Sequence, residues 1–235
     1  KSRGTRIRPE MLFDESVIRA FVSGLPFSLT IGQKKAAWQI IQDMQKSIPM
    51  NRLLAGDVGS GKTVVAGISM RHAVQSGFQC AILAPTDVLA RQHKETFDAL
   101  FGKNTSLRIL LCTGTDVVFS GLEGKTFAAR RRDAYDKIAT GQVDICVGTH
   151  ALLGEKVNFH RLGLVIVDEQ HRFGVGQRKM LKEKSGIAPM VPHFLSMTAT
   201  PIPRTYALML YGDLDVSPLR EMPKGRIPVA TSVCA

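Results

Sequence analysis

The sequence has no run of eighteen or more apolar residues, the length that a membrane-spanning helix needs. Its first ten residues, KSRGTRIRPE, are basic and lack the apolar core of a secretory signal peptide. From these two absences we expect no membrane partner, and the usage of cysteine described next favours a cytoplasmic location.

Cysteine is scarce, and no two cysteines form a CxxC pair. The absence of such pairs argues against a zinc ribbon or a redox motif. Three of the four, Cys80, Cys112 and Cys146, lie within apolar runs, and Cys234 lies near the end of the chain. We predict that the three act as small buried hydrophobes in a reducing compartment.

Acidic residues are outnumbered, with 20 Asp and Glu against 31 Lys and Arg, which gives a formal net charge of +11. Such an excess favours a polyanionic partner, of which nucleic acid is the commonest. The alternative is a basic, solvated surface without a partner.

What the 235 residues do contain is an alternation of short apolar runs and helical stretches. This alternation predicts an α/β fold with a doubly wound, mostly parallel sheet and helices on both faces. The predicted strands cover residues 52–55, 80–84, 107–112, 143–147, 163–167 and 193–197. The predicted helices cover residues 11–23, 62–76, 87–101, 126–140 and 203–211. Residues 115–126 are irregular and predict a surface loop.

One octapeptide, GDVGSGKT, matches the phosphate-binding pattern GxxxxGK[ST] between an apolar run and a helical stretch. Glycines let backbone N–H groups turn toward phosphate oxygens, the lysine offsets β- and γ-phosphate charge, and the hydroxyl that follows binds Mg²⁺. We therefore predict an ATP site formed by Gly56, Asp57, Val58, Gly59, Ser60, Gly61, Lys62 and Thr63.

A second pattern, LVIVDEQH, places two carboxylates directly after a buried strand. A carboxylate at that position can hold Mg²⁺ opposite the phosphate loop, and its neighbour can polarise the attacking water. We assign Asp168 to Mg²⁺, together with Thr63, and Glu169 to the water. The predicted catalytic set is then Lys62, Asp168 and Glu169.

The pair GDVGSGKT and DEQH resembles superfamily 2 helicases of the DExH-box type. The resemblance implies that FSLTIGQ binds adenine through Phe27 and Gln33; a glutamine amide can both donate to and accept from the base. It also implies that the stretches APTDVLARQH, TG and VGTH bind DNA, through Pro85, Thr86, Arg91, Gln92, Thr113, Gly114, Gly148, Thr149 and His150. Coupling of hydrolysis to movement is implied for His171, Thr198, Ala199, Thr200 and Arg204. The run Arg130–Arg132 permits DNA contact, but a charged helix face is usually only solvated.

Four longer stretches, GDVGSGKT, DEQHRFGVGQR, MTATPIPRT and YGDLDVS, resemble the RecG family of branched-DNA translocases. The resemblance covers roughly residues 25–230 and implies a RecA-like first motor domain. It further implies an ATP-dependent DNA helicase that remodels replication forks and Holliday junctions in recombination and repair. Two features depart from the family: Arg91 stands where an acidic residue is frequent, and residues 115–126 look longer than usual.

The resemblance also predicts how the chain is divided. We expect a linker and lead-in helix over residues 1–24, the motor domain over 25–230, and the start of a connection over 231–235. Since the chain does not begin with Met, we expect a piece of a longer protein. The family's N-terminal wedge domain and second RecA-like domain would then be partners from the same parent chain. The second domain carries the arginine finger, so this chain alone should be a poor ATPase.

Three other functions remain open from the sequence. The nearest is a transcription-repair coupling translocase, which shares GDVG, HRFGV and TATPIPRT but usually has DEEH. Another is an ATP-driven motor that moves protein, which DNA stimulation of its ATPase would argue against. The third is a nucleotide-binding module without turnover.

Overall fold

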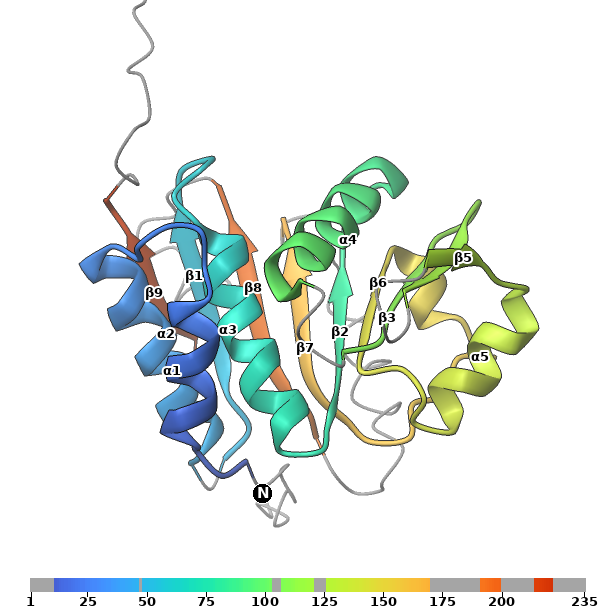
Figure 1. Cartoon of the computed structure of the whole chain (residues 1–235), viewed down its shortest axis with the longest axis horizontal. Coiled ribbons are helices and arrows are strands. Elements are labelled where there is room, and N and C mark those ends of the chain that lie inside the picture. Colours follow the sequence, from blue (N-terminus) through green and yellow to red (C-terminus); the bar gives the residue numbers. More distant parts are fainter. Residues whose placement is uncertain are drawn as a thin grey trace, which may run out of the picture.

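The computed structural model describes residues 11–46, 48–102, 107–120, 126–169, 191–199 and 214–221. Within these ranges the chain forms one nine-stranded sheet in the order β5-β4-β3-β6-β2-β7-β8-β1-β9 (Figure 1). The strands are β1 Asn51–Gly56, β2 Gln79–Leu83, β3 Ile109–Cys112, β4 Val117–Ser120, β5 Thr126–Ala128, β6 Ile145–Gly148, β7 Leu162–Asp168, β8 His193–Thr198 and β9 Asp215–Leu219. The helices are α1 Glu15–Ser23, α2 Ile31–Met44, α3 Lys62–Gln75, α4 Asp87–Phe101, α5 Arg131–Ala139 and the 3₁₀ turn η2 His150–Leu153.

Every strand pairing from β3 across to β9 is parallel, and only β4 and β5 add antiparallel pairings at one edge. The six predicted strands coincide with β1, β2, β3, β6, β7 and β8. Each of these is buried along nearly its whole length, as expected for parallel strands covered on both faces.

Helices cover both faces of the sheet, as predicted. Side chains of α1, α2, α3 and α4 pack with one set of alternate strand residues into the larger core cluster, on the face turned to the viewer in Figure 1. The opposite set packs with α5, η2 and residues 157–159 into a second cluster. Cys80, Cys112 and Cys146 are buried in these clusters, as predicted.

Several predicted boundaries were wrong. Residues 115–126 are not a plain surface loop, because β4 lies within them and β5 begins at Thr126. The helix predicted over 126–140 is shortened to α5, since residues 126–128 pair with β4 instead. Helix α2 and edge strand β9 were not among the predicted elements. The helix predicted over 203–211 lies outside the described residues.

The lead-in helix α1 packs on the same core as the rest of the chain. Its Phe21 stacks on Phe101 of α4, with ring centroids 5.3 Å apart, and Met11 just before it is buried. Asp14 caps the helix by accepting a hydrogen bond from the backbone N–H of Ser16, at 2.9 Å. The predicted division at residue 25 stays a prediction. In the described ranges, no helix has the length and apolar character to cross a membrane.

Candidate active site at the carboxyl edge of the sheet

The predicted site residues converge because parallel strands end at the same edge of a sheet. The carboxyl ends of β1, β2, β6, β7 and β8 lead directly into the phosphate-loop pattern, residues 84–86, residues 149–150, the DEQH carboxylates and Thr198–Ala199. Ligands of open α/β folds bind beyond this edge. Motifs separated by more than a hundred residues therefore face a common space.

The loop between β1 and α3 has a backbone that only glycine tolerates at its turning points. Gly59 and Gly61 have φ values of 82° and 88°. A Cβ on Gly61 would also lie 2.2 Å from Nε2 of Gln33. Helix α3 begins directly after Gly61, and no side chain caps it. The first N–H groups of α3 are thus available to an anion.

Lys62 lies inside this loop. Its Nζ donates to the carbonyl oxygens of Gly56 and Asp57, at 2.7 and 3.1 Å. Burial lowers the pKa of Lys62, while the nearby charges of Asp168, Glu169 and Asp57 oppose that shift. The ammonium group is therefore partly desolvated and close to both predicted catalytic carboxylates.

The donor set fits a nucleoside triphosphate with Mg²⁺. The Oγ of Ser60 is buried and, among the described residues, has no hydrogen-bond partner, so it is a donor left over for a ligand. No cluster of three or more His, Cys, Asp or Glu side chains suited to a metal ion occurs in the described part of the chain. Mg²⁺ does not need such a cluster, because it is often held by one or two protein oxygens while phosphate and water complete its coordination.

The two carboxylates after β7 are fixed by different neighbours. Asp168 accepts a hydrogen bond at Oδ1 from the backbone N–H of Glu169, at 3.1 Å, and its Oδ2 lies 2.7 Å from Nε2 of His93. Glu169 accepts at Oε1 from the backbone N–H of Ala199, at 3.3 Å. With a φ of 52°, Glu169 is the one non-glycine residue of the described ranges with a positive φ. Such strain persists where the surroundings impose it, often at functional sites.

Gln33 joins α2 to the phosphate loop. Thr30 and Gln33 form a capping box, in which Oε1 of Gln33 accepts from the N–H of Thr30 at 2.9 Å. Nε2 of Gln33 donates to the carbonyl oxygen of Ser60 at 2.8 Å, and the side chain is buried. Each polar atom of the amide already has one partner, so one N–H and one lone pair of Gln33 are left for adenine.

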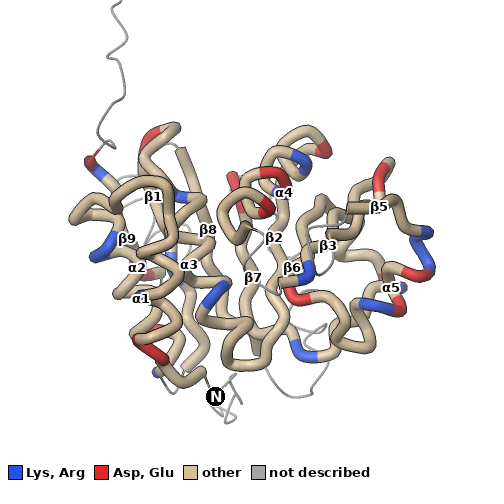
Figure 2. Tube along the Cα trace, in the orientation of Figure 1, with Lys and Arg blue, Asp and Glu red and all other residues tan. Residues whose placement is uncertain are grey.

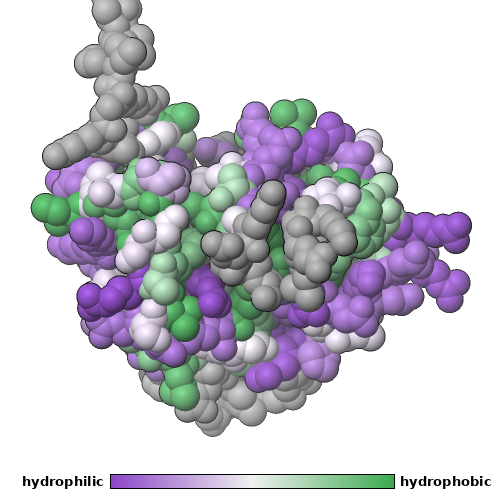
Figure 3. Space-filling view, viewed as in Figure 1, coloured by the Kyte–Doolittle hydropathy of each residue, from purple (hydrophilic) through white to green (hydrophobic). Residues whose placement is uncertain are grey.

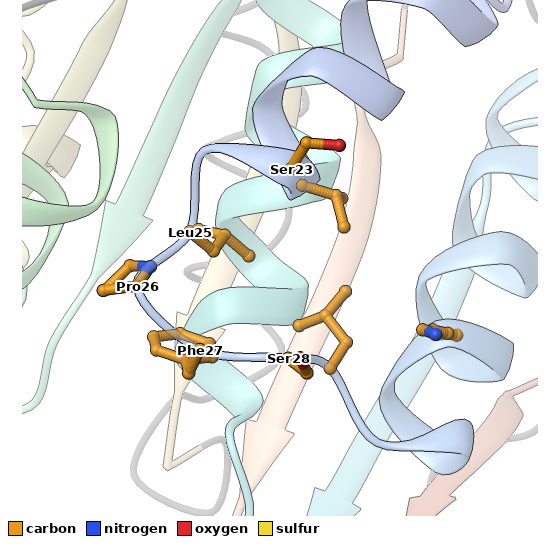
Figure 4. A pocket seen from close by; sticks show the side chains of 8 residues that line it. Ser23, Leu25, Pro26, Phe27 and Ser28 are labelled. Atoms are coloured by element: carbon orange, nitrogen blue, oxygen red, sulfur yellow. The ribbon is translucent and has the colours of Figure 1, made fainter.

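A pocket of about 340 Å³ lies on the loop between α1 and α2 (Figure 4). Its lining includes Leu25, Pro26, Phe27, Leu29 and Lys34. Phe27 is 48% exposed, which is unusual for a large apolar ring. Leu29 and Lys34 of the lining flank the Thr30–Gln33 capping box on its two sides in the sequence.

The predicted DNA contacts at the start of α4 surround Asp87. Thr86 caps α4 by accepting from the N–H of Leu89 at 3.3 Å. Burial acts to raise the pKa of Asp87, but hydrogen bonds from the hydroxyls of Thr115, Thr113 and Thr149 outweigh it and lower that pKa. One carboxylate thereby joins the ends of β2, β3 and β6.

Some of the predicted DNA-binding side chains have partners within the chain. Arg91 is paired with Asp116 and also donates to Thr115, and the hydroxyl of Thr113 accepts from the N–H of Asp116 at 3.0 Å. Thr113 and Thr149 are buried, whereas Thr86, Gln92, Gly114 and His150 are exposed. The structure brings this set together at one edge of the sheet.

Gly148 is required by close approach, because a Cβ there would lie 2.2 Å from the carbonyl oxygen of Cys112. This contact brings the ends of β6 and β3 together beneath Thr149 and Gly114. Arg131 connects α5 to the β3–β4 turn by donating hydrogen bonds to the carbonyl oxygens of Thr113 and Gly114, at 2.8 and 3.0 Å.

The remaining charges of α5 lie on the surface. Arg130 and Arg132 are exposed, and the exposed acidic residues Asp133 and Asp136 follow them (Figure 2). Figure 3 shows that hydrophilic side chains gather over this end of the molecule. Mixed charge of this kind is typical of a solvated face, so the helix does not form a purely basic strip.

Three contacts were not predicted from the sequence, namely His93 with Asp168, Asp87 with the three threonines, and Arg131 with the β3–β4 turn. Each joins residues far apart in the chain, and no local pattern signals them. His171, Thr200 and Arg204, predicted to couple hydrolysis to movement, lie outside the described residues. Thr198 is buried at the end of β8, beside Ala199.

Comparison with known proteins places these features in a family. Residues 30–209 match the family model described as DEAD/DEAH box helicase. The chain is 49% identical over 217 residues to the ATP-dependent DNA helicase RecG of Synechocystis sp., covering 92% of this chain and 24% of that protein. It is 47% identical over 219 residues to RecG of Streptococcus pneumoniae, covering 93% of this chain and 30% of that protein. The chain thus spans less than a third of the length of these relatives.

Solved structures agree on the fold. A structure of RecG bound to a three-way DNA junction is similar over 94% of this chain and 28% of that chain, with a TM-score of 0.78 and 39% identity. A DEAD box protein from Methanococcus jannaschii is similar over 89% of this chain and 55% of that chain, with a TM-score of 0.57 and 22% identity. At that lower identity the likeness concerns the fold alone.

Proposed function

This chain belongs to the DEAD/DEAH box helicase family, and from that premise we propose that it is the ATP-binding first motor domain of a DNA helicase of the RecG type. The parent protein would use ATP to translocate on duplex DNA and remodel branched structures such as forks and junctions. Identity of 47–49% to RecG proteins supports this assignment over a transcription-repair translocase or a protein-moving ATPase.

The observation that carries the proposal is the convergence of Lys62, Asp168 and Glu169. They come from the two halves of the chain, and the charges of Asp168 and Glu169 act on the pKa of Lys62. A cation, a metal-binding carboxylate and a second carboxylate within one partly desolvated space are the parts that phosphoryl transfer to water needs.

Each residue has a separate role in the proposed site. Gly56–Thr63 surrounds the phosphates with N–H groups, and Lys62 leaves its two carbonyl partners to bind the β- and γ-phosphates. Thr63 and Asp168 hold Mg²⁺, which when bound neutralises charge on the phosphate oxygens. Glu169 orients the attacking water, and its hydrogen bond to the N–H of Ala199 ties it to the proposed coupling motif. Phe27 and its pocket receive the adenine.

The proposed DNA surface lies at the same edge, over the ends of β2, β3 and β6. Exposed Thr86, Gln92, Gly114 and His150 are placed to meet phosphate oxygens through hydroxyl, amide, backbone and ring groups. RecG in the similar solved structure is bound to a three-way DNA junction. We propose the same class of ligand for this chain's parent protein, with its wedge domain and second motor domain as partners.

The test is Glu169→Gln in the full-length parent protein. The amide keeps the size of the side chain but cannot polarise water, so turnover should fall by roughly 100-fold or more while the affinity for an ATP analogue changes little. Steady-state ATPase and fluorescent-analogue binding measure the two effects.

Glu155→Gln is the matched control, because it makes the same chemical change at an exposed glutamate that is not among the predicted site residues. It should leave both values unchanged. Turnover at the wild-type rate in Glu169→Gln would show that Glu169 does not act on the water.

A further inference from the structure

Helix α4 reaches the catalytic carboxylates through one side chain, His93. Its Nε2 lies 2.7 Å from Oδ2 of Asp168, and the two side chains are only 11% and 13% exposed. A carboxylate can only accept hydrogen bonds, so the ring nitrogen is the donor and the proton resides on Nε2. The contact is short, largely shielded from water, and directional.

The ring of His93 is held in place by aromatic packing. It lies nearly parallel to Phe97, one turn further along α4, with centroids 6.1 Å apart and an angle of 17°. Phe97 is fully buried and stacks in turn on Phe101, which stacks on Phe21 of α1. The His93 ring that donates the hydrogen bond is therefore held in place by the hydrophobic core.

This hydrogen bond orients Asp168 without blocking it. Oδ2 accepts from His93, and Oδ1 accepts from the N–H of Glu169. A carboxylate offers about four lone-pair positions, so each oxygen keeps one for a ligand. Two donors on two different oxygens fix the plane of the carboxylate.

The N-terminal end of α4 lies in the proposed DNA surface. Thr86 caps the helix, and Asp87 accepts from the hydroxyl of Thr115 at 3.1 Å. His93 follows Thr86 by two helical turns, a rise of about 10 Å. Because α4 is one continuous helix, a shift of its first turn moves His93 as well.

We propose that His93 is a positioning residue that fixes the Asp168 carboxylate for Mg²⁺ and connects it to the DNA-facing end of α4. The proposal rests on the function proposed above, in which Asp168 holds Mg²⁺ and the start of α4 meets DNA. Residues that orient a metal ligand from behind typically change metal affinity or activity by about 10- to 100-fold when they are lost.

Two substitutions separate the hydrogen bond from the packing. His93→Phe keeps a ring against Phe97 but has no donor, whereas His93→Gln keeps an N–H donor at a similar reach. His160→Phe makes the same change at an exposed histidine and serves as the control. The measurement is the Mg²⁺ concentration for half-maximal binding of a fluorescent, non-hydrolysable ATP analogue to the parent protein, with and without a three-way DNA junction.

His93→Phe should raise that Mg²⁺ concentration by about tenfold or more and abolish the shift that DNA causes in the wild type. His93→Gln should stay within about threefold of the wild type, and His160→Phe should not differ from it. Should His93→Phe fail to fold, His93→Leu, which also lacks a donor, can be compared with His93→Gln in its place.

A wild-type Mg²⁺ requirement in His93→Phe would overturn the proposal, as would equal losses in the Phe and Gln variants, because packing alone would then explain them. If the wild type binds the analogue without any dependence on Mg²⁺, the proposed function itself has failed, and the role of His93 falls with it.

Discussion

Several single side chains in this structure serve two partners at once. Gln33 caps α2 with one end of its amide and holds the phosphate loop with the other. Asp168 contacts His93 through one oxygen and Glu169 through the other. Substitution of such a residue changes two elements, so its effect on the site exceeds that of a single lost hydrogen bond.

His72 illustrates a buried polar group outside the site. It is 1% exposed, its ring centroid lies 6.2 Å from that of Phe13, and its Nε2 has no hydrogen-bond partner among the described residues. Burial lowers the pKa of His72 from 6.5 to about 4. The folded protein therefore holds this ring neutral at pH values where the unfolded chain is protonated.

The free energy of unfolding should consequently fall as the pH drops from about 6.5 to 4. In this range His72 is protonated in the unfolded state but stays neutral in the folded state. For this one group the loss approaches about 3 kcal/mol. His72→Leu should remove that part of the pH dependence, whereas His160→Leu, at an exposed histidine, should retain it. Urea unfolding of the three proteins at a series of pH values measures the difference; parallel curves for all three would contradict it.

At the scale of residues, the sequence predicted the chemistry of the ATP site but not its supporting contacts. Lys62, Asp168 and Glu169 follow from local patterns, because a phosphate loop and a strand-end carboxylate pair have fixed spacing. The hydrogen bond from His93 joins residues 75 positions apart, and only the packing of α4 on the sheet brings them together. The hydrogen bond of Gln33 to Ser60 and the ion pair of Arg91 with Asp116 likewise form only in the folded chain, so local sequence patterns do not signal them.

At the scale of elements, the turn into α3 is the part most sensitive to substitution. Gly61 and Gly77 both have positive φ, at 88° and 79°. A Cβ on Gly61 would meet Gln33 at 2.2 Å, whereas on Gly77 the nearest atom is the flexible Nη1 of Arg161 at 3.4 Å. The two glycines share backbone strain but differ in what a side chain would displace.

Gly61→Ala and Gly77→Ala should each lower the free energy of unfolding by about 1–2 kcal/mol through strain in the left-handed region. Only Gly61→Ala should also lose binding of an ATP analogue, because its Cβ displaces the Gln33 amide from the phosphate loop. Denaturation and analogue titration of both variants provide the check. Equal nucleotide affinity in the two variants would mean that the close approach of Gln33 is irrelevant to binding.

The predicted elements were most accurate where strands are buried on both faces, since continuous apolar runs such as those of β2 and β7 are unambiguous. Helix α2 was missed because its buried face includes the small residues Ala36 and Ala37, which give weak contrast. The β4–β5 hairpin was missed for another reason. Its four-residue strand β4 is defined by pairing with β3, its three-residue strand β5 is defined by pairing with β4, and β5 is exposed throughout.

At the scale of the whole molecule, the net charge of +11 bears on the proposed partner. Most of this positive excess comes from residues outside the described ranges. Within those ranges the charge is mixed, as near α5, where Arg130–Arg132 are followed by Asp133 and Asp136 (Figure 2). Positively charged side chains attract the phosphates of DNA, and this attraction does not distinguish base sequences.

Binding of duplex DNA by this chain should therefore weaken steeply with salt. If about three phosphates are contacted, the affinity should fall roughly 40-fold between about 50 and 200 mM monovalent salt. Fluorescence anisotropy with two duplexes of equal length and unrelated sequence gives both the slope and its sequence dependence. A flat salt response, or a preference for one sequence, would argue against phosphate contacts as the basis of binding.

ATP turnover at Lys62, Asp168 and Glu169 should be driven by branched DNA. The most direct measurement is steady-state ATPase of the full-length parent protein with a three-way junction, with linear duplex of the same length, and without DNA. We expect the junction to stimulate turnover by about tenfold or more over linear duplex, and we expect Glu169→Gln to lose that stimulated turnover. Turnover that is the same with and without DNA would contradict it.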